Sequence, residues 1–212
     1  MTPYDPEKQL VFCHVPRTGG NSIWEYCFKP WFGAGAFMSV ENYSKSGPNS
    51  VIRDHWYSTQ GRGVDDWCPD ATQFVCFLRD PLERALSCYD HLRDNNAVLH
   101  GSRGTYNMAD LSLHSYIDCR ADEIATDALS GLPDESRCQI EDFVFVGVQS
   151  QMQKCTDAMA QLLGKPPKKV GIHNAAKASV AASPEDTAKL KELLVDEYKL
   201  YDRAVSYWGK YW

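Results

Sequence analysis

The segment HVPRTGGNS, residues 14–22, combines residue types that bind anions. It follows the apolar run LVFCHV (10–15) and leads into a helix-like segment. Glycines let a backbone approach an oxyanion closely, and the first turn of a helix adds N–H donors and a partial positive charge. The residues expected around a phosphate are Arg17, Thr18, Gly19, Gly20 and Ser22. A strand–helix connection that uses glycine only to turn is the alternative interpretation.

This loop differs from the common nucleotide-binding motifs. The triphosphate loop reads GxxxxGK[ST], but here the upstream glycine is missing and Asn21 stands where the lysine would precede Ser22. The dinucleotide motif GxGxxG is also absent. These differences disfavour a magnesium–triphosphate enzyme and a dinucleotide-dependent oxidoreductase.

A second segment, LRDPLERALSCY (78–89), carries another candidate phosphate site. Arg79 ends the apolar run FVCFL (74–78), and Asp80, Pro81 and Glu83 form a helix-start signal directly after it. In a parallel sheet, Arg79 would emerge at the same edge as the first loop. Ser87 lies two turns along that helix, so Arg79 and Ser87 together predict a site for a second phosphate.

The expected helix has a polar face that carries Arg84, Ser87 and His91 at helical spacing. For Arg84 and His91 taken alone, we expect an ordinary solvated face. Two phosphate sites at adjacent strand ends, without a triphosphate-loop lysine, indicate a nucleotide phosphorylated at two separate positions.

The elements that must position these residues alternate along the chain. Near-continuous apolar runs predict buried strands, and helical patterns follow them. The expected strands are 10–15, 74–78 and 143–148, with a weaker candidate in SVIRDHWYS (50–58). One helix should end at Gly164, and a last long helix should begin at Ser183-Pro184, with an apolar stripe from Leu190 to Trp208. The pattern predicts one α/β domain over residues 1–212, with a three-layer fold and a central parallel sheet flanked by helices.

The two motifs resemble those of the sulfotransferase family that uses 3′-phosphoadenosine 5′-phosphosulfate. HVPRTGGNS is similar to that family's 5′-phosphosulfate loop, particularly in the carbohydrate (Golgi-type) branch, and LRDPLERALSCY is similar to its 3′-phosphate segment. Softer matches in 142–164, HNAAKAS and the last helix follow in family order. The resemblance implies a P-loop-like fold and sulfuryl transfer from that donor, without a metal, to a hydroxyl of a carbohydrate or small-molecule acceptor.

The resemblance also implies roles for individual residues. Residues expected around the 5′-phosphosulfate are Arg17, Thr18, Gly19, Gly20, Asn21 and Ser22. Arg79 and Ser87 would hold the 3′-phosphate, and Lys177 of HNAAKAS would reach the nucleotide. Arg17 departs from the family's usual lysine: it keeps the charge but cannot donate a proton at neutral pH.

A hydroxyl acceptor benefits from a general base. His55, between the two motifs, is the candidate because the family often has a histidine there and imidazole has a suitable pKa; Asp54 and Glu41 are the alternatives. His14 is expected to support the turn. Arg53 is interpreted as a surface ion pair, or as a contact to an acidic acceptor.

The segments 33–50 and 58–70 are expected to be loops over the site end of the sheet. Aromatic residues in and beside them could form the walls of an acceptor pocket, with core packing as the alternative. These residues are Trp31, Phe32, Phe37, Trp56, Tyr57 and Trp67.

The composition bounds the remaining possibilities. A net charge of −6 disfavours a nucleic-acid partner, and no apolar run is long enough to span a membrane. With no signal pattern and no zinc spacing among the eight cysteines, we expect a soluble, cytoplasmic protein, although Cys119 and Cys138 could pair. A P-loop small-molecule kinase and a non-catalytic nucleotide- or glycan-binding module remain as alternatives.

Overall fold

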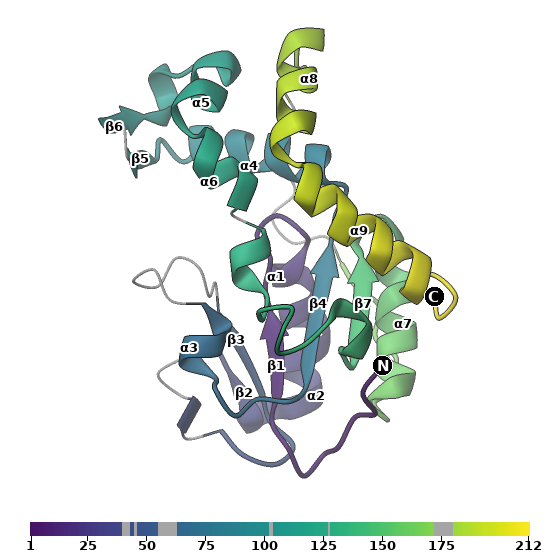
Figure 1. Ribbon diagram of the computed structural model, residues 1–212. Helices are drawn as coiled ribbons and strands as arrows, with labels where there is room; N and C mark the ends of the chain where they lie inside the picture. The colour runs from purple at the N-terminus through teal and green to yellow at the C-terminus, as the bar shows by residue number, and fades with distance from the viewer. Residues whose placement is uncertain (40–42, 45, 55–62, 102–103, 127, 172–179) are drawn as a thin grey trace.

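The computed structural model describes residues 1–39, 43–44, 46–54, 63–101, 104–126, 128–171 and 180–212 (Figure 1). In this part of the chain the central sheet has the strand order β2-β3-β1-β4-β7, and all neighbouring strands are parallel. Its strands are β2 (Ala36–Phe37), β3 (Val51–Asp54), β1 (Leu10–Cys13), β4 (Phe74–Leu78) and β7 (Phe145–Val148). The predicted α/β class with a parallel sheet is confirmed.

The strongest apolar runs form the middle of the sheet. Every residue of β1, β4 and β7 is buried, as expected for strands covered on both faces. In the register, Val11 of β1 lies between Ile52 of β3 and Phe74 of β4. The strand predicted at 74–78 is confirmed residue for residue, whereas the first ends two residues earlier than predicted and the third begins two residues later.

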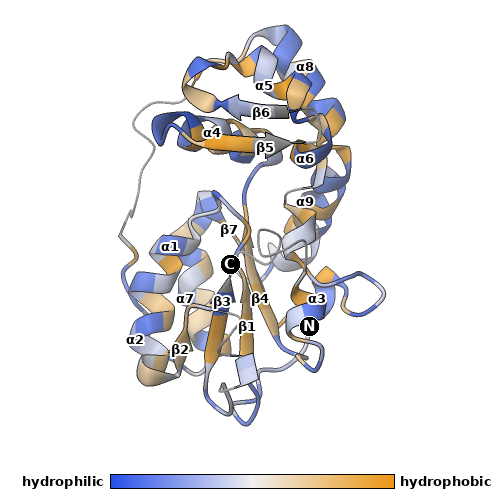
Figure 2. Cartoon of the chain, turned by 90° about the vertical axis from the view of Figure 1, so that its left-hand side faces the viewer, coloured by the Kyte–Doolittle hydropathy of each residue, from blue (hydrophilic) through white to orange (hydrophobic). Residues whose placement is uncertain are grey.

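Helices cover both faces of the sheet (Figures 1 and 2). One face carries a continuous helical segment and a separate helix: α1 (Gly20–Ile23), the π-helical turn η1 (Trp24–Phe28), α2 (Lys29–Phe32) and α7 (Met152–Leu162). The other face carries α3 (Val64–Trp67) and α9 (Val195–Trp208). The helix predicted to end at Gly164 does end there, with this glycine at φ 62°.

A second group of elements stands over the carboxyl ends of the strands, and we call it the helical lobe (Figure 1). It contains α4 (Pro81–Asp94), β5 (Val98–Gly101), β6 (Gly104–Asn107), α5 (Leu113–Cys119), α6 (Ala121–Thr126) and α8 (Pro184–Leu193). Among the described residues, short 3₁₀ turns connect elements of both the lobe and the sheet region. They are η2 (Gly33–Gly35), η4 (Met108–Asp110), η5 (Leu129–Gly131), η6 (Ile140–Asp142) and η7 (Gln149–Gln151). The lobe has its own apolar cluster, built around Tyr89, Met108, Tyr116 and Leu190. A single domain over 1–212 stays a prediction.

The last helix differs from its prediction. Instead of one long helix, α8 and α9 are separated at Leu194. The stripe divides accordingly: Leu190 and Leu194 pack in the helical lobe, Trp208 packs in the core under the sheet, and Val205 is exposed. Because the two apolar clusters lie in different places, one straight helix cannot fill both.

The start of α4 follows its prediction. The Asp80 side chain accepts a hydrogen bond from the Glu83 amide at 3.0 Å, and Pro81 is the first helical residue. The Glu83 carboxylate accepts from Arg79 at 3.2 Å.

Part of the predicted loop 33–50 lies at the opposite end of the sheet from the one predicted. Ser46 and Asn49 bond to Gln9 and Pro6, which precede β1, so this stretch lies at the amino ends of the strands, away from the predicted site. Trp31 and Phe32 are buried in the core rather than in a pocket wall, and the Trp31 indole donates to the Pro166 carbonyl at 2.8 Å.

The other predicted pocket aromatics follow the same pattern. Phe37 and Trp67 are half-buried and pack against the core. Trp56 and Tyr57 lie outside the described residues. Core packing, the alternative interpretation, therefore holds for every one of these aromatics that the structure describes.

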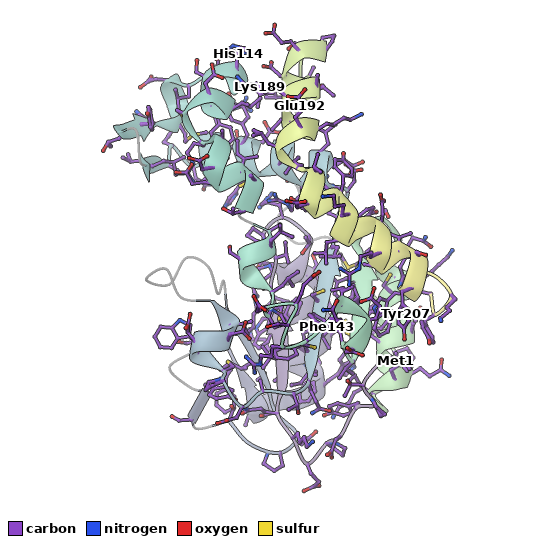
Figure 3. The ribbon with its side chains drawn as sticks, in the orientation of Figure 1. Met1, His114, Phe143, Lys189, Glu192 and Tyr207 are labelled. Atoms are coloured by element: carbon purple, nitrogen blue, oxygen red, sulfur yellow. The ribbon has the colours of Figure 1, made fainter. Side chains whose placement is uncertain are left out.

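The two termini pack against α9 and the central sheet. The Met1 amino group donates to the Tyr207 hydroxyl of α9 at 3.1 Å (Figure 3), and the Trp212 indole donates to the Val146 carbonyl of β7 at 3.0 Å. All eight cysteines lie within the described ranges and are free thiols, so the suggested Cys119–Cys138 disulfide is absent. Among the helices that the structure describes, none is both long and apolar enough to cross a bilayer.

Candidate functional site

The loop after β1 lies where the strand order changes direction. From β1 the chain continues to β2 and then β3 on one side, and β4 follows on the other side of β1. In open α/β sheets, ligands bind at this switch point, outside the carboxyl ends of the strands. The loop after β1 and the segment after β4 therefore meet at one edge, as the sequence predicts.

The loop backbone is left-handed at two of its residues. Arg17 and Gly19 are both in the left-handed region, with φ of 66° and 86°. Gly19 is the N-cap of α1 and brings no side chain to the first amides of the helix, which have no partners inside the helix. Thr18 is fully buried, and its hydroxyl donates to the Val15 carbonyl at 2.8 Å. The hydroxyl of Thr18 therefore stabilises the loop from inside.

Gly20 is required because of its contact with His14. A Cβ added at Gly20 would lie 1.9 Å from His14 Cδ2 and 2.1 Å from Nε2. The His14 ring is buried and stacks on Phe12, with centroids 5.6 Å apart. The supporting role predicted for His14 agrees with this packing: its imidazole lies directly beneath the first turn of α1.

The structure places Arg53 beneath the loop and not at the surface. It is 6% exposed, so the predicted surface ion pair is wrong. Its guanidinium donates to His14 Nδ1, with Nε at 3.1 Å and Nη2 at 2.9 Å, and also to Asn21 Oδ1. Its Cζ lies 5.7 Å from the centre of the Trp24 ring. The pairing of Phe12 with Arg53 across β1 and β3, which places Arg53 beneath the loop, leaves no local signal in the sequence.

The second predicted site lies beside the first. Arg17 Nε donates to Ser87 Oγ of α4 at 3.2 Å, and Arg79 Nη1 donates to the Arg17 carbonyl at 3.4 Å. Ser87 is buried, while Arg79 is partly exposed. The structure thus brings together Arg17, Arg79 and Ser87, which the sequence placed at the ends of two different strands.

The electrostatics of this edge favour an anion. Burial lowers the pKa of Arg17; Cys88 acts in the opposite direction, and the positive charge of Arg79 lowers the pKa further. Desolvation of the ring by neighbouring atoms, and after it the charge of Arg17, lower the pKa of His91, one turn beyond Ser87 on α4. A bound anion would neutralise the repulsion between Arg17 and its positive neighbour.

Arg84 does not belong to a solvated polar face. It is 2% exposed, and its Nε and Nη2 donate to the two Glu197 carboxylate oxygens at 2.5 and 2.7 Å. The pair joins α4 to α9 and supports the helix that carries Ser87. His91, by contrast, is exposed, as the sequence predicts, and its Nδ1 lies 3.1 Å from Asn95 Nδ2.

The remaining predicted site residues lie in α1, at the end of β3, or outside the described residues. Asn21 and Ser22 lie in α1, at the start of the helix that follows the loop. His55, Glu41 and Lys177 lie outside the described residues. Asp54 is the last residue of β3 and pairs with Cys13 of β1, at the same edge of the sheet as the loop. Within the described ranges, no group of three or more metal-binding side chains is present.

A cavity of about 700 Å³ lies away from the loop and was not predicted. Its lining comes from α3, from residues 126–143 and from α9, on the face of the sheet opposite α1. The cavity has an apolar floor that includes Leu132, Ile140 and Phe143, and several carboxylates at its rim. Arg17, Arg79 and Ser87 do not line it, so the predicted chemistry and this cavity are separate.

Comparison with known families agrees with the geometry of the loop. The sulfotransferase family matches residues 2–164, well over half of the 212-residue chain. This match contains both predicted anion-binding segments and every strand of the central sheet. No curated protein matches the chain significantly. The chain belongs to the sulfotransferase family, enzymes that transfer sulfur-containing groups.

Proposed function

We propose that this sulfotransferase takes 3′-phosphoadenosine 5′-phosphosulfate as its donor and sulfates a hydroxyl of a carbohydrate or small-molecule acceptor. The observation that carries the proposal is the meeting of two anion-binding segments through Arg17: its side chain reaches Ser87 at 3.2 Å, and its carbonyl receives Arg79 at 3.4 Å. A ligand with phosphate groups at two separate positions uses both segments, whereas a monophosphate uses only one.

Each residue has a proposed part. The 5′-phosphosulfate would be surrounded by Arg17, the N–H of Thr18, Gly19, Gly20, Asn21 and Ser22. Arg79 and Ser87 would hold the 3′-phosphate, and Lys177 would approach the nucleotide from its loop. The two glycines support this assignment because Gly19 is left-handed and Gly20 leaves no room for a side chain beside His14.

Sulfuryl transfer, like phosphoryl transfer, is an in-line displacement in which the protein mainly positions groups and neutralises charge. Arg17 would stabilise the negative charge that develops on the departing phosphate. It would do so electrostatically, because a guanidinium stays protonated at neutral pH. His55 would remove the proton of the acceptor hydroxyl, with Asp54 and Glu41 as alternatives.

Ligand-dependent thermal unfolding tests the donor. The melting temperature would be compared with 3′,5′-adenosine bisphosphate, ATP with magnesium, and 5′-AMP. At about 100 times its Kd, a ligand stabilises the folded state by ~2.7 kcal/mol. We expect only the bisphosphate to raise the melting temperature strongly. Stabilisation by ATP with magnesium instead would support a P-loop kinase and overturn the proposal.

Turnover of labelled sulfate donor with a panel of sugar and phenolic acceptors tests the reaction. We expect His55→Ala to lower the rate by about 10²–10⁴, the usual contribution of a general base, and to leave bisphosphate binding intact. His114→Ala is the control, since His114 lies on α5 in the helical lobe, where its Nδ1 is 2.8 Å from the Asp186 carboxylate. If the wild-type protein binds the bisphosphate but turns over no acceptor, the non-catalytic binding module is the better description.

A further inference from the structure

Arg53 connects the strand beside the loop to two residues of the loop region. Its side chain starts from β3, passes beneath the first turn of α1, and bonds to His14 Nδ1 and Asn21 Oδ1. Arg53 and His14 are both almost fully buried, at 6% and 4% exposure, whereas Asn21 is half-buried and reaches the loop surface. The network therefore runs from the core to the face where an anion would lie.

The contact with Arg53 determines which end of the Asn21 amide faces the loop. A guanidinium has only donors, so the atom that it meets must be the amide oxygen. With Oδ1 held by Arg53, Nδ2 and its two hydrogens point to the other side. A carboxamide free to rotate would present its oxygen to an anion part of the time, and that orientation is repulsive.

The same reasoning determines the form of His14. Since Arg53 donates to Nδ1, that nitrogen carries the lone pair, and the proton of the neutral ring is on Nε2. The Nε2 edge is the one that packs against Gly20. A ring held in this way keeps the first turn of α1 at a constant height above β1.

We propose that Arg53 is a positioning residue for the 5′ end of the donor. It orients the Asn21 amide so that Nδ2 donates to the 5′-phosphosulfate, and it holds His14 as the Nε2-protonated support of the loop. The inference rests on the proposed function, because it requires an anion at the loop. Arg53 itself lies below the loop and acts through Asn21 and His14.

The test compares two ligands that differ only at the 5′ position. Calorimetry would give the Kd of 3′,5′-adenosine bisphosphate and of adenosine 3′-monophosphate. We expect Arg53→Met, Asn21→Ala and Asn21→Asp each to reduce the preference for the bisphosphate by about tenfold or more. The double variant Arg53→Met/Asn21→Ala should lose little beyond Arg53→Met or Asn21→Ala alone. Asn21→Asp keeps an oxygen for Arg53 but has no hydrogen to donate.

Arg137→Met is the matched control. Arg137 is a partly buried arginine, whose Nη2 donates to the Cys68 and Ala71 carbonyls at 2.7 Å and whose Cζ lies 5.4 Å from the Phe74 ring centre. Its loss is expected to lower the melting temperature and leave the ligand preference unchanged. If Arg53→Met behaves like Arg137→Met, Arg53 has only a structural role and the inference is overturned.

Two further results keep the test decisive. If Arg53→Met does not fold, Asn21→Asp decides, and an unchanged preference there overturns the inference. Nitrogen NMR of the wild-type protein should find His14 neutral with its proton on Nε2; a proton on Nδ1 contradicts the geometry. If the wild-type protein binds neither ligand, the proposed function is overturned. If the wild-type protein binds the bisphosphate but the variants keep its preference, only the inference about Arg53 is overturned.

Discussion

Arg84 of α4 and Glu197 of α9, 113 residues apart in the chain, form a two-point ion pair that is almost completely buried, with bonds of 2.5 and 2.7 Å. The pair joins α4, which carries Ser87, to α9, which packs against the central sheet. Replacing one partner leaves the other charge buried, at a cost of about 3–5 kcal/mol. We therefore expect Glu197→Gln or Arg84→Met to lower the free energy of unfolding by this amount in urea denaturation.

The double variant Arg84→Met/Glu197→Leu separates the charge effect from the packing effect. Removing both charges eliminates the unpaired buried ion, so most of the lost stability should return. Equal destabilisation by the single and double variants would mean that packing, and not the ion pair, carries the effect.

Ser87→Ala should weaken the 3′-phosphate site selectively. Ser87 Oγ lies 3.2 Å from Arg17 Nε at the proposed 3′-phosphate position. A hydrogen bond to a charged group contributes about 1.5–3 kcal/mol, so affinity for 3′,5′-adenosine bisphosphate should fall roughly tenfold or more. Affinity for 5′-AMP, which lacks the 3′-phosphate, should change much less. If Ser87→Ala lowers the affinity for both nucleotides equally, Ser87 is not part of the 3′-phosphate site. Ser136→Ala is the control, because Ser136 lies on an exposed turn.

Gly20→Ala should displace the loop, because the new methyl group would meet the His14 ring at 1.9 Å. Overpacking of this kind costs about 1–3 kcal/mol, and the shift of α1 should also weaken bisphosphate binding. Gly47→Ala is the matched control, since nothing lies within 4 Å of a Cβ at Gly47 and its φ is not positive. Calorimetric melting and binding of both variants measure the difference; similar behaviour would contradict the tight contact.

His114 should make stability depend on pH. Its Nδ1 lies 2.8 Å from the Asp186 carboxylate, which joins α5 to the first turn of α8, and Asp118 and Lys189 lie beside it in the helical lobe (Figure 3). The hydrogen bond to Asp186, and after it the charge of Asp118, raises the pKa of His114 above 6.5. The stabilisation is therefore fully present below pH 6.5 and is lost as the pH rises through the raised pKa.

The same pair has an acidic limit. The hydrogen bond from His114 lowers the pKa of Asp186 below 3.8, so its contribution is lost only as the pH falls through that lowered value. We expect His114→Gln to flatten the fall of melting temperature between pH 6 and pH 8.5. The control His91→Gln should not change this fall. Because the pKa of His91 is lowered, its protonation affects stability only at pH values below about 6.5. If the melting temperature of His114→Gln falls between pH 6 and pH 8.5 as steeply as that of the wild-type protein, the His114–Asp186 pair does not cause this fall.

Local patterns were enough to predict which residues meet at the carboxyl ends of β1 and β4. The apolar strands, the glycine turn and the Asp80–Pro81 helix start are signals within a few residues of one another, and the structure bears them out. Because parallel strands end at one edge, the meeting of Arg17 with Arg79 and Ser87 followed from the strand assignments. The division of the last helix, the burial of Arg84 and the place of loop 33–50 depended on contacts between distant segments, and there the local interpretation was wrong.

The sequence by itself determined the α/β class, the glycine turn and the capped helix start after two neighbouring strands, and the family membership that these motifs indicate. It could do so because strand burial, turn chemistry and helix capping act over short stretches of chain. The tertiary structure decided what lies beneath the loop and what holds the lobe in place. Arg53 reaches His14 and Asn21 only because β1 and β3 pair in one register, and Arg84 meets Glu197 only because α9 crosses α4. A polar side chain is solvated or buried according to the partner that folding brings to it, and that partner is not its neighbour in sequence.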